Sequence, residues 1–127
     1  MSYPEELSYT KDHEWIKFTD DNKATIGITD YALEQLGDVV FVELPDDDTT
    51  FSAGDSFGTV ESTKTVSDLY IPIDGRVIAV NKDLTENLEQ FSDDPYGKGW
   101  LIKISFEEKN GELLSAKEYE EFVNSEG

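Results

Sequence analysis

Short alternating segments, separated by frequent turn residues, are the feature of this sequence that most restricts its fold. In the segment 23–28, Ala24, Ile26 and Ile28 alternate with other residues, as they do on one face of a half-buried strand. Strand-like segments also occupy 13–18, 39–44, 56–62, 69–73, 77–80 and 100–104. This spacing predicts about seven or more short strands in an antiparallel sandwich or flattened barrel, with helices at its periphery.

Two helices are predicted inside this β framework. Thr29 is a suitable N-cap for a short helix ending at Leu36, and Gly37 follows as a helix-stopping residue. Leu84, Leu88 and Phe91 recur at helical spacing and predict a second short helix.

The chain end and one turn carry further local signals. Ser115 and Glu118 match a capping box, which predicts a C-terminal helix over about residues 115–124. Asp74 and Gly75 predict a hairpin between the strands at 69–73 and 77–80. No linker divides the sequence, so we expect one domain over 1–127 with a core at about 9–105.

Composition excludes several classes of function. The 127 residues contain no cysteine, which excludes disulfides, thiolate nucleophiles and cysteine metal sites. A net charge of −19 disfavours nucleic acid and anionic membrane surfaces, since both attract clustered basic residues. His13 is the only histidine, so we expect it to be structural or exposed, with no triad and no metal site. The same excess of acids predicts a soluble monomer and also suits partners with basic faces.

The first residues carry no targeting signal. The segment 1–6 has neither a basic region nor an apolar one, and the sequence contains no apolar run of about 18 residues. We therefore expect a cytoplasmic, prokaryotic protein, or a mitochondrial matrix protein only if a presequence has been removed.

Lys64 lies between two flanking threonines, Thr63 and Thr65, in a segment bounded by similar turns. Gly54 lies ten residues before it and Gly75 eleven residues after it. If the two similar halves of this segment, one on each side of Lys64, fold about a pseudo-twofold axis, Lys64 lies at the tip of the hairpin that connects them. An exposed lysine is a poor general base, because its pKa is not lowered by burial, but it is open to acylation. These residues alone leave open that Lys64 is an ordinary turn lysine.

The segment 57–80 resembles the lipoyl-attachment region of the glycine cleavage system H-protein family. Residues 61–68, ESTKTVSD, are similar to that family's E-S-x-K-x-x-S-D signature. The similarity continues through HEW at 13–15, GITD at 27–30, LGDVVFVELP at 36–45, DPYGKGWLIKI at 94–104 and LSAKEY at 114–119. It therefore covers nearly the whole chain.

The resemblance implies a fold, a cofactor and a set of partners. The fold would be a barrel-sandwich hybrid of the biotinyl/lipoyl type, with an external C-terminal helix. The chain would be a carrier and not an enzyme, with lipoic acid amide-linked to Lys64. The arm would move the aminomethyl group of glycine between glycine decarboxylase, aminomethyltransferase and dihydrolipoamide dehydrogenase. A lipoate ligase or lipoyltransferase would attach it.

The resemblance also assigns supporting roles to four acidic residues. Glu61 would help a lipoylating enzyme to recognise the hairpin. Glu14 and Asp68 would line a surface cleft that holds the aminomethyl-loaded arm, and Asp12 stands where the family often has Ser. The alternative for these acids is a solvated face on a very acidic protein.

The sequence departs from the family at two places. Thr65 follows the lysine where the family usually has Ala or Ser, and the loop 46–49 lacks the glycine that the family tends to carry. Either departure could alter the preference of the lipoylating enzyme or the length of the loop.

Three other functions remain open at this stage. A biotin carrier would have the same fold, but its lysine usually lies between methionines and this chain has threonines. A lipoyl relay protein, which hands lipoyl groups to other complexes, has no distinguishing feature in the sequence. The third alternative is an unmodified acidic interaction module.

Overall fold

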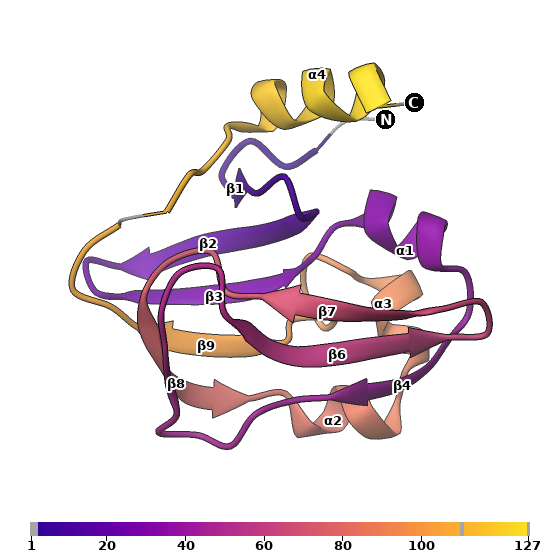
Figure 1. Cartoon of the computed structure of the whole chain (residues 1–127), viewed down its shortest axis with the longest axis horizontal. Helices are drawn as coiled ribbons and strands as arrows, with labels where there is room; N and C mark the ends of the chain where they lie inside the picture. The colour runs from indigo at the N-terminus through magenta and orange to yellow at the C-terminus, as the bar shows by residue number, and fades with distance from the viewer. Residues whose placement is uncertain (1–2, 110, 127) are drawn as a thin grey trace.

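The protein is described by a computed structural model that covers residues 3–109 and 111–126. Two antiparallel sheets form its body (Figure 1). The larger has the order β1-β2-β3-β9-β8-β5, with bounds Ser8–Tyr9, Glu14–Asp20, Lys23–Ile28, Ile102–Ser105, Gly75–Val80 and Thr50–Phe51. The smaller has the order β4-β6-β7, with bounds Val39–Glu43, Ser56–Ser62 and Val66–Tyr70. The sheets do not close into a barrel, but a barrel-sandwich hybrid is compatible with this arrangement.

The main core lies between the two sheets. Ile16 and Ile26 of β2 and β3 are fully buried there, and Val60 and Leu69 of β6 and β7 come from the opposite sheet. Burying such an aliphatic side chain stabilises the fold by about 1.5–3 kcal/mol. The alternation of apolar residues in the strand segments is therefore explained, because alternate side chains of each strand face the core.

Four helices complete the described chain: α1 Asp30–Leu36, α2 Lys82–Glu86, α3 Glu89–Asp93 and α4 Ala116–Glu126. Thr29 caps α1 by accepting a hydrogen bond from the Ala32 amide, and Gly37 ends the helix with a φ of +84°. That backbone conformation favours glycine. The first helix is thus confirmed with its predicted cap and end.

The C-terminal helix α4 packs on a second apolar cluster, on the side of the large sheet away from the main core (Figure 1). Strand β2 contributes side chains to both clusters. Trp15 belongs to the second cluster, and its neighbour Ile16 belongs to the main core. The Trp15 indole covers Gly27 on the paired strand, where a Cβ would come within 2.5 Å of the ring. The Ser115–Glu118 capping box is confirmed by reciprocal hydrogen bonds of 2.9 and 3.1 Å.

Several local expectations were wrong. Asp74 and Gly75 do not form a hairpin, because β7 and β8 belong to different sheets and the chain crosses between them at 71–74. Pro72 lies in this crossing, and its missing N–H prevents continuous strand pairing. The helix predicted around 84–91 is divided into α2 and α3, with Asn87 and Leu88 between them. The last strand begins at Ile102 and not at Trp100.

No helix among the described residues is long and apolar enough to cross a membrane.

Candidate functional site

Lys64 lies at the turn of the β6–β7 hairpin, as predicted, and its side chain is exposed. The Ser62 amide donates to the Thr65 carbonyl at 2.8 Å and closes the turn. The Ser62 hydroxyl oxygen accepts hydrogen bonds from the Lys64 and Thr65 amides, both at 3.2 Å. One short side chain therefore satisfies two amides of the turn and fixes the backbone on which Lys64 is mounted.

The hairpin tip is also attached to the turn between α1 and β4. The Thr63 amide donates to the Asp38 carbonyl at 3.1 Å. The stem of Lys64 passes over Gly37, where an added Cβ would lie 3.4 Å from the Lys64 Cε. Within 3–109 and 111–126, no carboxylate forms an ion pair with Lys64. The amine is therefore presented to solvent from a braced turn.

A cavity of about 310 Å³ lies beside this tip, between α1 and the strands β2, β6 and β7. Leu36 lines it and directly precedes Gly37, over which Lys64 passes. Its lining combines apolar side chains with three carboxylates. The lining residues are Asp12, His13, Glu14, Ile28, Tyr31, Ala32, Gln35, Leu36, Val60, Ser67, Asp68 and Leu69. An apolar cleft with a few converging polar groups is the usual form of a small-ligand site.

Glu14 is the most unusual residue of this cavity. It is 1% exposed, and its Oε2 accepts a hydrogen bond from the Tyr70 amide at 2.6 Å. Its Oε1 is buried and has no hydrogen-bond partner among the described residues. Burial raises the pKa of the Glu14 carboxyl well above its ordinary value, the Tyr70 amide opposes this shift, and Asp12 adds to it.

Two of the other acids selected from the sequence line this cavity, and one does not. Asp12 and Asp68 line the same cavity as Glu14, and both are exposed at its rim. Glu61 does not line the cavity. It lies on the outer face of the small sheet, paired with Phe41 on one side and Val66 on the other.

The contributions of α1 and α4 to the site were not predicted from the sequence. Tyr31 and Gln35 line the cavity from α1, where they are four residues apart and so share a helix face. His13, which we expected in a strand, precedes β2 in a left-handed conformation with a φ of +67°. Its Nδ1 shares a hydrogen bond of 2.8 Å with the hydroxyl of Tyr119 on α4. No local pattern indicates this contact across the chain.

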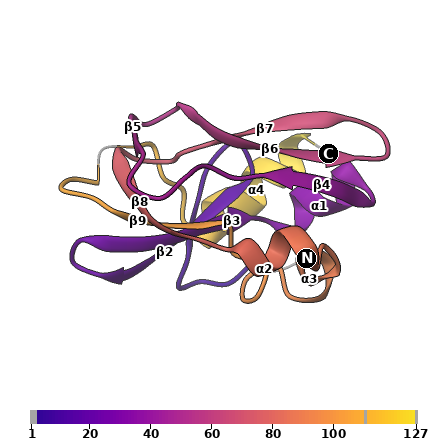
Figure 2. The same ribbon diagram turned by 90° about the horizontal axis from the view of Figure 1, so that it is seen from below.

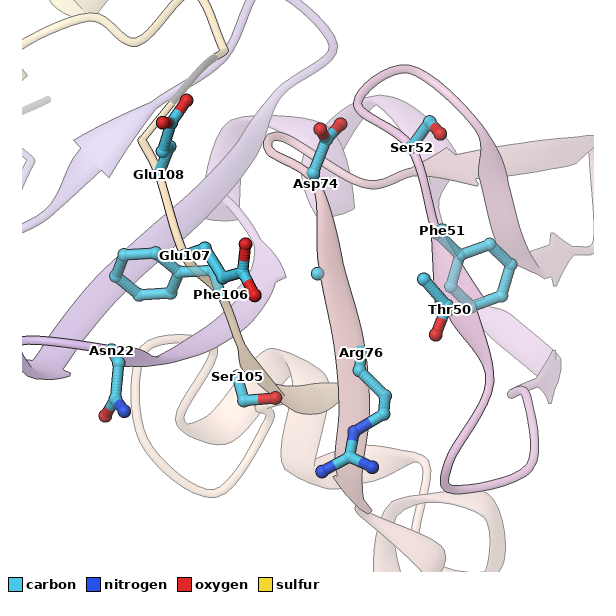
Figure 3. A pocket seen from close by; sticks show the side chains of 11 residues that line it. Asn22, Thr50, Phe51, Ser52, Asp74, Arg76, Ser105, Phe106, Glu107 and Glu108 are labelled. Atoms are coloured by element: carbon cyan, nitrogen blue, oxygen red, sulfur yellow. The ribbon is translucent and has the colours of Figure 1, made fainter.

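The structure also contains a larger cavity, of about 590 Å³, seen from close by in Figure 3. Its lining comes from β5, β8 and the segment after β9, and these elements lie opposite the Lys64 hairpin (Figure 2). Arg76 lines it and forms an exposed ion pair of 3.8 Å with Asp48. The cavity contains no buried polar atom that lacks a partner among the described residues.

Known proteins similar to this chain share one family name. A family model described as "Glycine cleavage H-protein" matches residues 7–126. A glycine cleavage system H protein of Carboxydothermus hydrogenoformans is 52% identical over 126 residues, covering 98% of this chain and 96% of the relative. One from Herpetosiphon aurantiacus is 50% identical over 123 residues, covering 97% and 95%.

A solved structure shows the same fold. The crystal structure of a glycine cleavage system H protein from Mycobacterium marinum superposes with a TM-score of 0.89 at 45% identity. It covers 98% of this chain and 99% of its own.

The fold and site define a small β protein that presents one exposed lysine on a braced hairpin, beside a cleft with a buried carboxyl. More specifically, the chain belongs to the glycine cleavage H-protein family.

Proposed function

We propose that this protein is the lipoyl-bearing carrier of a glycine cleavage system, with Lys64 as its attachment residue. The observation that carries the proposal is the position of Lys64 at the exposed tip of the β6–β7 hairpin, beside the cavity that contains Glu14. Membership of the H-protein family supports the same role.

Attachment requires an accessible, uncharged amine. The Lys64 Nζ, once deprotonated, would attack the carbonyl carbon of an activated lipoyl group such as lipoyl adenylate. An amide bond forms, the bond from the carbonyl carbon to the phosphate oxygen breaks, and AMP and a proton leave. The braced turn supports this reaction because the backbone of Lys64 is already ordered before a modifying enzyme binds.

The neighbouring cavity suits the loaded end of such an arm. When bound, the lipoyl group supplies a disulfide that can accept the aminomethyl carbon and two electrons. Apolar residues such as Ile28 and Leu69 would cover its hydrocarbon part. The unpartnered Glu14 Oε1 would gain a hydrogen bond and an opposite charge from a cationic amine. We assign Asp68 and Asp12 a weaker role at the rim, where solvent screens their charges.

The carrier itself would perform no chemistry. Its contribution is to keep the arm at high local concentration near glycine decarboxylase, aminomethyltransferase and dihydrolipoamide dehydrogenase in turn. The monomeric state and the cytoplasmic location stay predictions from the sequence.

Replacement of the lysine tests the assignment. We expect Lys64→Arg to fold like wild type, because exposed turn residues usually change stability by less than about 0.5 kcal/mol. Incubation with a lipoate ligase, lipoic acid and MgATP should add one lipoyl group to wild type and none to the variant, as measured by intact mass. A lipoyl group found on the Lys64→Arg protein would show that another residue is modified.

Two assays separate the functions that the sequence left open. Capture by avidin after co-expression with a biotin ligase would indicate a biotin carrier. For the relay role, the gene would be expressed in a strain that lacks the glycine cleavage carrier but keeps its lipoylation pathway. Restored glycine cleavage supports the proposed function, and its absence with an intact lipoyl group favours a relay protein.

A further inference from the structure

Three apolar side chains are exposed next to the Lys64 hairpin, and we call them the outer apolar patch. Val40, Phe41 and Val66 are 47%, 52% and 60% exposed. In the described part of the chain, every other large apolar side chain is buried or half-buried. They lie on β4 and β7, the two strands that flank β6 in the small sheet (Figure 1).

Strand register brings two of these residues into one row with an acid. Phe41 pairs with Glu61, and Glu61 pairs with Val66, so the three side chains share the outer face of the sheet. The next row on the same face contains Glu43, Thr59 and Asp68, and Asp68, on the edge strand β7, also lines the rim of the cavity. The opposite face packs on the core through Val42 and Val60.

A bulge in β4 increases this exposure. The register of β4 against β6 shifts between Val39 and Phe41, and the extra residue is Val40. Val39 packs against the core, whereas Val40 and Phe41 are both exposed in succession. Bulges often redirect side chains near functional sites. The exposed apolar surface is therefore produced by a local feature of the backbone and not by the end of a strand.

We propose that the outer apolar patch is the docking surface for the enzyme that transfers the lipoyl group to Lys64, beside Glu61, whose recognition role the family resemblance already implies. This inference rests on the proposed function and extends it to a partner. A complementary surface on the enzyme would have apolar side chains beside a basic group, because Glu61 and the acids of the next row give the patch a negative rim.

The place of the patch favours a modifying enzyme over the enzymes that use the finished arm. A lipoyl-transferring enzyme must bring its reacting carbonyl to the Lys64 amine itself. It must therefore contact the surface next to the hairpin. Glu61 is three residues from Lys64, and Val66 is two residues from it. An enzyme that receives the extended arm can dock farther away, because the arm spans the distance.

Lipoylation kinetics test the proposal. The Phe41→Ser/Val66→Ser double variant is compared with wild type as the substrate of a lipoate ligase, using lipoic acid and MgATP and following intact mass with time. We expect kcat/KM for the carrier to fall about 30-fold or more, the effect of losing one interface hot spot, with kcat nearly unchanged. Phe41→Leu, which keeps an apolar side chain, should retain most of the wild-type value.

A control outside the patch accounts for general effects of removing an apolar side chain. Phe51→Ser changes a partly buried residue at the opposite end of the molecule and should be lipoylated at the wild-type rate (Figures 2 and 3). Circular dichroism and urea unfolding confirm that each variant is folded.

The outcomes separate this inference from the proposed function. If wild type is not modified at Lys64, the proposed function fails. If wild type is modified and the double variant has the same kcat/KM, only the docking surface is wrong. A double variant that is lipoylated normally, but no longer supports release of labelled carbon dioxide from glycine by glycine decarboxylase, would assign the patch to that enzyme and overturn the proposal. A loss confined to lipoylation supports it.

Discussion

At the scale of single residues, Glu14 differs most from what its chemistry favours in isolation. A carboxyl group that is 1% exposed, with one oxygen lacking a partner among the described residues, destabilises the folded chain when it is ionised. Proteins retain such groups mainly where they act on a ligand. The cost at Glu14 is therefore consistent with a site that is completed when a cation enters the cavity.

This cost should appear in the pH dependence of stability. The folded protein holds the Glu14 proton to a higher pH than the unfolded chain, whose carboxyl titrates near 4.5. As the pH rises above that value, the unfolded chain loses its proton first, so the free energy of unfolding should decrease up to the raised pKa. Glu14→Gln lacks this titration and should be more stable than wild type at about pH 8, by about 1–3 kcal/mol.

Urea unfolding at several pH values measures this difference. The gap between Glu14→Gln and wild type should widen as the pH increases from the acid side. A constant gap would show that the Glu14 proton is not responsible. Asp68→Asn, at the exposed rim of the same cavity, is the matched control and should show little change with pH.

At the scale of elements, the Tyr119 hydroxyl joins α4 to the cavity by hydrogen bonds, and the Phe122 ring of α4 also packs near His13. Tyr119 is fully buried, and burial raises the pKa of its hydroxyl, which therefore stays protonated. This hydroxyl lies 2.8 Å from both the His13 Nδ1 and the Thr29 Oγ1. His13 lines the cavity and Thr29 caps α1. One hydroxyl thus connects α4 both to a residue that lines the cavity and to the N-cap of α1.

Removal of that hydroxyl should loosen the connection without disturbing the apolar packing. We expect Tyr119→Phe to lower the free energy of unfolding by about 1–2 kcal/mol, because the buried Thr29 hydroxyl and the half-buried His13 ring each lose a hydrogen-bond partner. Chemical denaturation measures the change. Tyr70→Phe is the control, since its hydroxyl makes only a long 3.5 Å contact with Asp68. Equal stabilities for the two variants would contradict the role of the Tyr119 hydroxyl.

The elements also show what the sequence could and could not predict. The hairpin that presents Lys64 was predicted because its strands and turn lie next to each other in the chain. Turn residues do not reveal which sheet the following strand enters, so the hairpin at Asp74 and Gly75 was wrong. The cavity joins residues from 12 to 69, and only the family resemblance associated Glu14 with Lys64. Exposure of Phe41 was not predicted, because a bulge leaves no periodic signal.

At the scale of the whole molecule, a net charge of −19 opposes the compact state. Salt should therefore stabilise the protein. We expect the Tm to rise by about 3–6 °C between about 0.01 and 0.15 M NaCl, the change that corresponds to about 1 kcal/mol in a domain of this size. Differential scanning calorimetry measures it. A Tm that stays constant or decreases would show that self-repulsion is not a significant term.

The bond between the Thr63 amide and the Asp38 carbonyl has a consequence for how the arm moves. Because the tip of the hairpin is tied to the α1–β4 turn, the pivot of the arm stays stationary with respect to the body. In the proposed carrier, the reach of the arm from this pivot would be set by the length of the lysine side chain and its lipoyl extension. Each proposed partner enzyme would then have to bring its active centre within that radius of the hairpin tip.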